Sequence, residues 1–594
     1  MRPPPNIGSE METIQRVVDI LEYGVFEFGL PFGEETIPLV VIVLLGSGVY
    51  FTLRLGFVQL RRFGHGLAVA TGRYDDPDEP GDVSHFQALS TALSATVGVG
   101  NIAGVAVALH WGGPGALFWM WITGALGMAT KYAEVTASMK YREVREKRPD
   151  DPAWAGTVSG GPMYYMEQGL GKGWKPVAVF FALCLMFSSF LSGNGVQANT
   201  IADVLQTQFS IPMWVSGLAG AAIVGSVIIG GITRIGKVTG ILAPAMASLY
   251  VAGAMVIILL NVDQLLPALS LIIREAFNPT AGIAGTGVGV FLVTALWGVR
   301  RGLFSNEAGL GSAAIAHAAA QTDEPVSEGV VALLGPFIDT IVICTMTALV
   351  ILMTSSWDDR FPTEINLASG DVGFVEEHPD GQITVFSASP EGIQVENGVP
   401  VEAGVGVPRL AWHQVAVDTF YTDQDLTETF TGVIYPGENR ALADEGLEYP
   451  ALFGNAVQNG APLTMLAFQR GLPGEWGHYI VVLTVLLFAI STAIAWSYYG
   501  DRCAVYLFGD RALLPFKVVF VGMHFLGAVA PLALAWVLAD VFLFVAVVPN
   551  VIAVIILTPK VKELTDSYFE RKPWIENAQV HRRVVNERRM RKGP

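Results

Sequence analysis

The sequence predicts an all-α polytopic membrane protein with about eleven transmembrane helices. Of its 594 residues, 52% are hydrophobic and only 15% are charged, and the mean hydropathy is +0.47. A soluble domain needs more charge on its surface. Apolar runs long enough to cross a bilayer recur along the chain, whereas a transmembrane β-barrel would show short alternating segments.

Eleven apolar runs are candidate spans: one leading span, then ten spans numbered one to ten. They cover residues 37–56, 87–110, 114–139, 176–204, 211–231, 237–261, 284–318, 328–354, 477–498, 514–534 and 536–557. The segment 1–36 lacks the basic-then-apolar pattern of a secretory signal, so we expect the leading span to direct insertion.

Basic residues orient this arrangement in the cell membrane. The connection between spans two and three carries seven Lys or Arg, and the tail 558–594 carries ten. The opposite connections "HWGGPG" and "QTQFSIP" have none. Because basic residues collect on the cytoplasmic side, we expect the N-terminus outside and a cytoplasmic, basic C-terminal tail in contact with the inner leaflet.

The connection between spans seven and eight is unusually acidic. Residues 357–459 contain 18 Asp or Glu and 3 Lys or Arg, a balance of −15 in a chain of net charge −17. Its runs "GQITVFSAS" and "EGIQVENGV" predict short strands. We expect a small β-rich extracellular insertion or a partly ordered cap. Such an acidic surface fits a halophilic source, although it also arises for solubility alone.

Span one contains the stretch "ATVGVGNIAG" (95–104), with weak helix formers near its middle. Gly98 and Gly100 destabilise a helix and remove side-chain bulk. Unwound backbone at membrane depth is tolerated only inside protein or beside a water-filled cavity, where it offers amides and carbonyls to ligands. The alternative is close helix packing through small residues.

Span six repeats this feature. The run "TALWGVRRGLFSNEAGLGSAAIAHAAA" (294–320) is interrupted by four glycines. Spans one and six are each the first span in a set of five, 87–261 and 284–557. Because each set has an odd number of spans, the second set crosses the membrane in the opposite direction to the first. Paired interruptions of this kind indicate a transporter binding site at the bilayer midplane.

Several polar residues lie within the apolar runs. Asp339 of span seven is a candidate sodium ligand or charge balance, or a structural partner of an arginine in span six. Ser491 and Thr492 of span eight are hydroxyls that usually bond a carbonyl one turn back. Gln197 of span three either binds a ligand or bonds a neighbouring helix.

Arg300, Arg301 and Glu307 fall, by the predicted boundaries, in the inner half of span six. We expect them to form an ion-pair network that closes the cytoplasmic gate. The three cysteines suggest neither a disulfide framework nor a metal cluster. The sequence has no nucleotide-binding loop or nucleophile elbow, so we expect neither an enzyme nor a nucleic-acid-binding protein.

Five motifs together resemble the alanine or glycine:cation symporter family. They are "TALSATVGVGNIAGVA", "GGPGALFWMW", "SGGPMYY", "RGLFSNEAGLGSA" and "FAISTAIAWSYYG". The resemblance covers about residues 40–560, apart from the acidic insertion. It implies a leucine-transporter-like fold with a 5+5 inverted repeat preceded by one extra helix, and sodium-driven import of small neutral amino acids.

The resemblance also implies a site. The substrate would be held by Gly98, Val99, Gly100, Asn101 and Gln197, with Trp297 and Gly298 at the span-six break bounding a small cavity. Sodium would be held by Ser491, Thr492 and carbonyls near Ser94 and Val97, while Thr96 and Asp339 would lie near the substrate amine or a second cation.

The resulting hypothesis is a sodium-coupled symporter of alanine or glycine that lies in the lipid bilayer and works by alternating access. A monomer is favoured, and the oligomeric state stays open. Two alternatives stay open. One is proton coupling through Asp339 or Glu307. The other is a transporter-like sensor in which the insertion reports binding of the amino acid.

Overall fold

The computed structural model describes most of the chain. The described residues are 28–32, 35–146, 156–279, 288–368, 372–377, 383–386, 392–401, 409–413, 415–474, 476–530 and 533–591. Helix is present in each of the eleven predicted spans. Most of the N-terminal segment 1–36 and the start of span six, before residue 288, lie outside the described residues.

The first half of the chain is helical after one short hairpin, β1 (Gly29–Phe32) with β2 (Glu35–Pro38). A second two-stranded pair, β3 (Glu143–Val144) with β4 (Val158–Ser159), follows the third long helix. The helices are α2 (Leu39–Arg54), α3 (Val58–Arg61), α4 (Phe63–Ala70), α5 (His85–Thr96), α6 (Val105–Gly112), α7 (Ala116–Lys140), α8 (Pro162–Tyr164), α9 (Lys175–Phe190), α10 (Val196–Phe209), α11 (Met213–Ile228), α12 (Gly231–Leu260) and α13 (Leu265–Phe277).

The second half is helical except for one β-rich segment. Its helices are α14 (Val288–Asn306), α15 (Ser312–His317), α16 (Pro325–Ala332), α17 (Leu334–Pro336), α18 (Thr345–Met353), α19 (Gly460–Gly471), α20 (Gly477–Phe508), α21 (Leu513–Val529), α22 (Ala533–Arg571) and α23 (Trp574–Arg591).

The helices have the length and composition of membrane spans. Among the described residues, six helical segments are long and apolar enough to cross a bilayer, and the bent pair His85–Thr96 with Gly100–Gly112 makes a seventh. Two shorter apolar helices, α2 and α11, coincide with further predicted spans. The protein is therefore a multi-pass helical membrane protein.

The acidic segment folds between α18 and α19 into three antiparallel sheets, with strand orders β12-β16-β5, β11-β10-β6-β7 and β15-β14-β13-β8-β9. The strands are β5 (Arg360–Asn366), β6 (Val372–Glu377), β7 (Ile383–Phe386), β8 (Ile393–Glu396), β9 (Val399–Pro400), β10 (Arg409–Trp412), β11 (Val415–Ala416), β12 (Phe420–Tyr421), β13 (Gly432–Tyr435), β14 (Arg440–Ala443), β15 (Glu448–Tyr449) and β16 (Ala451–Val457). Strands β5 and β16 pair from Arg360 with Val457 to Asn366 with Ala451, so the chain leaves and re-enters the helical part at one place.

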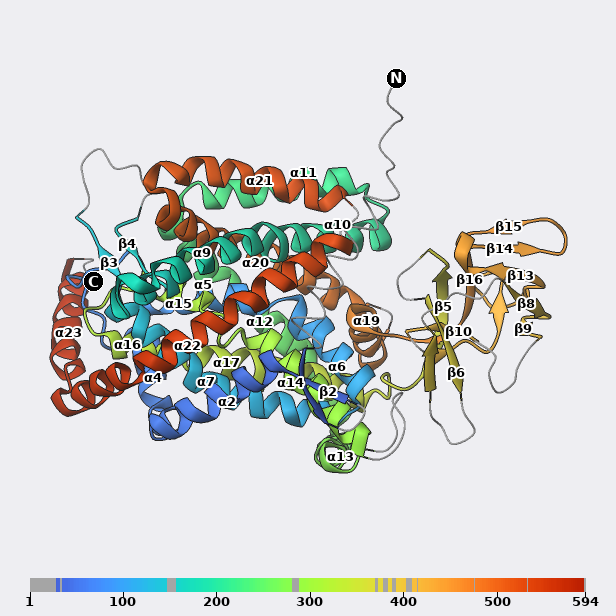
Figure 1. The fold of residues 1–594 in the computed structure, drawn as a ribbon, viewed down its shortest axis with the longest axis horizontal. Helices are drawn as coiled ribbons and strands as arrows, with labels where there is room; N and C mark the ends of the chain where they lie inside the picture. The colour runs from blue at the N-terminus through green and yellow to red at the C-terminus, as the bar shows by residue number, and fades with distance from the viewer. Residues whose placement is uncertain are drawn as a thin grey trace, which may run out of the picture.

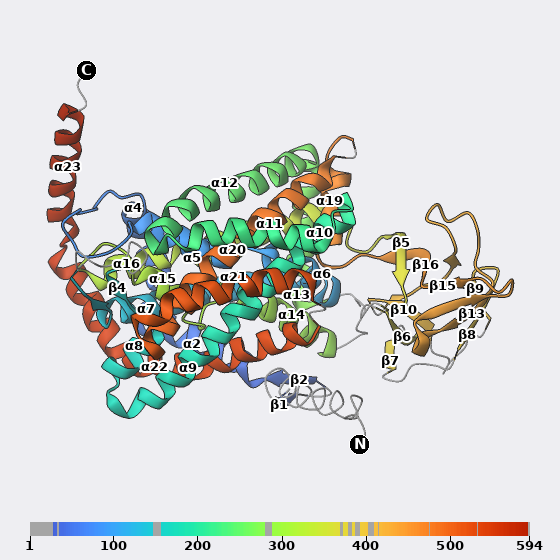
Figure 2. The ribbon, with the colours of Figure 1, turned by 90° about the horizontal axis from the view of Figure 1, so that it is seen from above.

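The strands of the acidic segment, β5 to β16, lie at one end of the long axis and α23 lies at the other (Figures 1 and 2). We call these the β end and the α23 end. The segment has its own apolar cluster, which includes Ile365, Phe420 and Leu452. In the helical part, buried residues of span one up to Ala95 belong to one apolar cluster, and those from Val97 to Leu109 belong to another. The core therefore divides where span one is interrupted.

Candidate functional site

Span one is broken at the predicted place. Helix α5 ends at Thr96, Val97 is extended with φ −75° and ψ 97°, and a π-helical turn begins at Gly100. The two halves are bent by 57°. The Asn101 Oδ1 atom accepts a hydrogen bond from the Gly98 amide at 2.8 Å, which stabilises the break from within.

Span six is also broken, between α14 and α15. Glu307, Gly309 and Gly311 have positive φ angles of 52°, 96° and 76°. This conformation suits the two glycines but strains a residue with a side chain. The predicted pair of interrupted spans is therefore confirmed.

Trp297 and Gly298 do not lie at this break, as the resemblance led us to expect. Both are inside α14, about ten residues earlier. A Cβ atom on Gly298 would lie 2.2 Å from the Ala116 carbonyl oxygen of α7, so this glycine lets the two helices pack closely. The Trp297 ring stacks on Trp111 with centroids 5.8 Å apart.

A cavity of about 320 Å³ lies between the two breaks. Its lining comes from spans one, three, six, eight and ten: Ala95, Thr96, Gly98, Val99, Gly100, Ala103, Gly104, Val107, Ser192, Val196, Gln197, Arg301, Phe304, Glu307, Thr492, Trp496 and Leu543. This volume is at the lower end of the range for small-molecule sites. Most of the lining residues that spans one and six contribute lie at the breaks or between the breaks and the β end.

The structure brings four of the seven predicted substrate residues to this cavity: Gly98, Val99, Gly100 and Gln197. The Gln197 Nε2 atom donates to the Ser192 carbonyl oxygen at 3.1 Å. Its Oε1 atom is buried and has no partner among the described residues. Since a buried acceptor without a partner is costly, Gln197 can receive a donor from a ligand.

Asn101 is fully buried and does not line the cavity. Its Nδ2 atom donates to the Ser305 hydroxyl at 2.8 Å and to the Asp339 backbone carbonyl at 3.0 Å. The side chain therefore joins the break of span one to spans six and seven rather than pointing at a ligand.

Close walls restrict the ligand. A Cβ atom on Gly100 would lie 3.3 Å from the Phe304 ring, and one on Gly98 would lie 3.2 Å from the Thr492 hydroxyl. The glycine backbone of span one is thus exposed between an aromatic ring and a hydroxyl. A side chain at either glycine would therefore narrow the cavity beside the unwound backbone.

Three residues of the predicted sodium site meet where α5 approaches α20. The Thr492 Oγ1 atom donates to the Ser94 carbonyl oxygen at 3.1 Å. The Ser491 hydroxyl lies 3.4 Å from the same oxygen and also bonds the Phe488 carbonyl of its own helix at 2.9 Å. The Ser94 hydroxyl is buried without a partner among the described residues. Val97, also predicted here, is the extended residue at the end of α5.

Thr96 and Asp339 form a second group of incompletely paired oxygens. Asp339 is fully buried, and its Oδ1 atom accepts from the Thr340 hydroxyl at 2.5 Å. The Thr96 side chain lies close to this carboxylate, but among the described residues neither its hydroxyl nor the Asp339 Oδ2 atom makes a hydrogen bond of good geometry. Within that part of the chain we find no arginine within 4.0 Å of the Asp339 carboxylate, so the alternative of an ion pair with span six is not observed.

The expected gate residues lie elsewhere than predicted. Arg300 and Arg301 belong to α14, on the β-end side of the break, because the break falls at 307–311, later than the predicted mid-span. Their guanidinium carbons are 5.9 and 5.5 Å from the Trp297 ring centroid. Glu307 lies at the break, and its Oε2 atom accepts from the Ser312 hydroxyl at 2.6 Å. The three residues therefore lie at the break or on its β-end side, and their role in a cytoplasmic gate stays a prediction.

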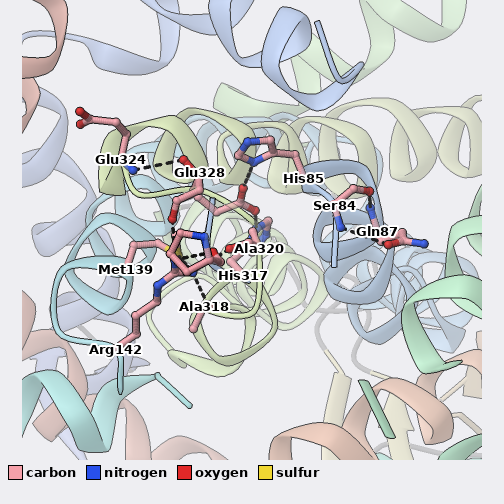
Figure 3. A network of polar contacts seen from close by, with 12 residues as sticks. Ser84, His85, Gln87, Met139, Arg142, His317, Ala318, Ala320, Glu324 and Glu328 are labelled. Atoms are coloured by element: carbon pink, nitrogen blue, oxygen red, sulfur yellow. Dashed lines mark hydrogen bonds and ion pairs between the residues drawn. The ribbon is translucent and has the colours of Figure 1, made fainter. Parts of the chain in front are cut away.

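Sequence reasoning missed a buried network at the α23 end, which Figure 3 shows. Glu328 of α16 lies between His85, the first residue of α5, and His317, the last residue of α15. Each imidazole Nδ1 atom bonds a different oxygen of the carboxylate. All three side chains are at most 3% exposed. Ionisable residues inside apolar runs were the available signal, but neither histidine stood out in the sequence.

Arg142 extends this network from the end of α7. Its Nη1 atom donates to the Ala318 and Ala320 carbonyl oxygens, each at 2.7 Å. Its Nη2 atom donates to the carbonyls of Pro80 at 3.0 Å and Thr322 at 2.5 Å. The halves of both broken spans that lie toward the α23 end are thus tied to each other by Arg142 and by Glu328.

Comparisons with known proteins agree with this arrangement. A model of the sodium:alanine symporter family matches residues 33–373 and 446–582. The unmatched residues between these ranges belong to the β-rich segment.

Curated relatives match most of the chain. The sodium/alanine symporter AgcS of Methanococcus maripaludis is 36% identical, over 91% of this chain and 96% of its own length. An uncharacterized transporter of Haemophilus influenzae is 38% identical, over 89% and 93%. YrbD of Bacillus subtilis, whose name describes a sodium/proton-dependent alanine carrier, is 31% identical, over 90% and 91%.

Proposed function

Because this chain belongs to the sodium:alanine symporter family, we propose that it imports alanine and glycine together with sodium by alternating access. Family membership makes the protein an amino-acid symporter and not an enzyme. The choice of substrate and of coupling ion is our proposal. The observation that carries it is the cavity at the two breaks, where unwound backbone meets buried polar atoms that lack partners.

The substrate would lie along the unwound backbone of span one. Its carboxylate would be bound by main-chain amides of Val99 and Gly100, because amides freed from a helix are good anion donors. Its amine would donate to the Gln197 Oε1 atom, which has no donor in the part of the chain that the structure describes. The walls formed by Phe304 and Thr492 favour a side chain no larger than a methyl group.

Sodium would use buried oxygens that are weakly bonded to one another or that lack a partner among the described residues. A hard cation prefers carbonyl, hydroxyl and carboxylate oxygens. One such set is the Ser94 carbonyl with the Ser491 and Thr492 hydroxyls. The other is the Thr96 hydroxyl with the Asp339 Oδ2 atom. A cation at either place would satisfy oxygens whose burial otherwise costs free energy.

The remaining architecture is proposed as follows. The sets 87–261 and 284–557 form the inverted repeat of a leucine-transporter-like fold, after the leading helix 37–56. The N-terminus and the β-rich segment lie outside, and the α23 end lies in the cytoplasm. The buried network around Glu328 then closes the cytoplasmic side, and the lining of the cavity on the β-end side fits an outward-facing state.

Uptake of labelled alanine into proteoliposomes tests the proposal. We expect accumulation under an inward sodium gradient and none under a pH gradient alone. The rival is proton coupling, which the name of one relative includes and which the buried Asp339 would permit. Equal uptake with and without sodium, or accumulation driven by the pH gradient alone, would reject sodium coupling.

Asp339→Asn sharpens this test. The substitution removes the carboxylate charge from the group formed by Thr96 and Asp339. Because a contact with a charged group contributes about 1.5 to 3 kcal/mol, we expect the sodium concentration for half-maximal uptake to rise by about tenfold or more. Asp203→Asn is the matched control, since this acid is exposed on α10 and does not line the cavity. Asp339→Asn with unchanged sodium dependence would remove Asp339 from the sodium site.

A further inference from the structure

A second cavity, of about 430 Å³, lies at the α23 end of the leading helix. The chain turns sharply after α2, because Gly56 and Phe57 have positive φ angles of 63° and 55°. The short helix α3 then folds back, so that its last residues face the end of α2. The opposite wall is α22, which packs against α2 and contributes Lys562, Thr565, Asp566 and Phe569.

The lining of this cavity is strongly basic. It contains Arg54, Arg61, Arg62 and Lys562 but a single acid, Asp566. Asp566 already pairs with Lys562 at 2.9 Å. Among the described residues, no carboxylate lies within 4.0 Å of the three arginines, so three positive charges converge without an anion.

The arginines are held in place by uncharged partners. The Arg62 guanidinium lies 3.6 Å from the centroid of the Phe569 ring, and the Arg61 Nη1 atom donates to the Gly56 carbonyl oxygen at 3.4 Å. Partial burial and the neighbouring Arg61 charge lower the pKa of Arg62. Their repulsion is a cost that a bound anion would relieve.

The rim of the cavity is apolar and exposed. Leu53, Phe57 and Leu60 are 62%, 48% and 75% exposed, although they flank a cluster of charges. Side chains of this kind at the end of a membrane span contact the acyl chains and the headgroup boundary. Any ligand of the cavity therefore lies at the level of the lipid headgroups.

A strongly basic lining is not common to every cavity at the α23 end. Another cavity there has two basic and three acidic residues among its lining: Arg145, Lys172, Glu143, Glu167 and Asp510. We propose that the cavity between α2, α3 and α22 binds the phosphate group of an anionic phospholipid from the adjacent leaflet, with Arg54, Arg61 and Arg62 as its donors. Arginine forks suit phosphate oxygens, and basic pockets beside membrane helices bind such headgroups. This inference depends on the membrane position of the helices and not on the transported substrate.

Native mass spectrometry of the full-length protein in detergent tests the site. We expect the protein to retain added phosphatidylglycerol in preference to phosphatidylcholine. The variant R54Q/R61Q/R62Q should lose that preference by roughly tenfold or more, because each charge near a lipid surface contributes measurably to attraction. R54K/R61K/R62K keeps the charges and should keep at least part of the preference.

A matched control removes three other basic residues. R234Q/K237Q/R511Q changes two exposed side chains within α12 and one just before α21, none of which lines the cavity. It should bind phosphatidylglycerol like the unmodified protein, and all variants should elute as one species on size exclusion. An equal loss in this control, or an undiminished preference in R54Q/R61Q/R62Q, would overturn the proposal. Displacement of the lipid by inorganic phosphate alone would identify a free phosphate site and not a lipid site.

Discussion

The two halves of the broken spans are held in different ways. On the α23 side, Glu328 joins α5 to α15, because its carboxylate bonds the terminal histidine of each helix. Ser138 of α7 also donates to the Ala314 carbonyl oxygen of α15 at 2.8 Å. On the β side, α6 and α14 meet through the stacked rings of Trp111 and Trp297. The His110 Nε2 atom of α6 lies 3.0 Å from the His413 carbonyl oxygen of the β-rich segment.

This difference indicates which side of the cavity is locked. Hydrogen bonds to a buried charge have strict geometry and are costly to leave unmade, whereas aromatic contacts tolerate sliding. Opening the α23 side requires His85 and His317 to break their hydrogen bonds with the Glu328 carboxylate. On the β side the Asn101 amide donates to the Ser305 hydroxyl at 2.8 Å, a bond between neutral groups, so we expect that side to rearrange with a smaller loss of free energy.

Breaking the lock should produce the largest effect. Glu328→Gln removes the charge and one of two acceptor oxygens, so we expect the closed α23 side to lose about 2 to 3 kcal/mol. A cysteine placed at Ala95 should then react faster, roughly 30-fold or more, with a membrane-impermeant thiol reagent applied from the α23 side. The native cysteines are buried and give little background.

Glu324→Gln is the control for this measurement. Glu324 immediately precedes α16 and pairs with Arg571 of α22 at 2.7 Å, at the exposed surface. Because exposed pairs contribute little, its loss should change the labelling rate by less than about fivefold. If both variants react alike, the buried network does not hold that side closed.

Thr492→Val should have a smaller effect, within the cavity itself. It replaces the hydroxyl that donates to the Ser94 carbonyl oxygen at 3.1 Å with a methyl group of similar size. Losing one such contact costs about 1 kcal/mol, so the sodium concentration for half-maximal uptake should rise about fivefold. Thr492→Ser should restore it.

Thr484 of the same helix provides the comparison. Its hydroxyl bonds only carbonyls of its own helix, at 2.8 and 3.0 Å. We therefore expect Thr484→Val to leave the sodium dependence unchanged in the same uptake assay. A rise in both variants would point to general distortion of α20 and not to a contact with sodium.

The sequence predicted the breaks better than the contacts around them. Glycines at 98, 100, 309 and 311 weaken a helix through a local property that each residue carries with it. Gly298 also reads as a breaker, yet in the structure it serves close packing against Ala116. That distinction depends on a neighbouring helix nearly 200 residues away in sequence, which a local pattern does not contain.

The side-chain networks were harder to predict for the same reason. Asn101 was expected to bind the substrate, but its amide nitrogen donates to the Ser305 hydroxyl and to the Asp339 backbone carbonyl. His85 and Glu328 are 243 residues apart, and only the tertiary fold brings them together. Arg300 and Arg301 lie before the break of span six because the predicted span was centred several residues too early. Errors of a few residues in a boundary are enough to move a side chain from one half of a membrane to the other.

Removing the β-rich segment should have the smallest effect. Residues 367–450 can be replaced by Asn-Gly, a two-residue turn that suits a hairpin, because Asn366 and Ala451 are already paired across β5 and β16. Ile365 and Leu452, which lose their apolar neighbours, would be changed to threonine. The deletion also removes the acceptor of His110, a loss of about 1 kcal/mol.

For a symporter whose cavity is built from the helical part alone, sodium-driven alanine uptake by this deletion variant should stay within about twofold of the full-length rate, since no residue of 367–450 lines the cavity. The alternative is a sensor that reports amino-acid binding through the β-rich segment by way of His413 and α6. It predicts that the full-length protein binds alanine without transporting it, and that removing the segment changes the affinity. Measuring binding and flux on both proteins separates the two: binding without flux in the full-length chain would contradict the symporter, whatever the deletion does.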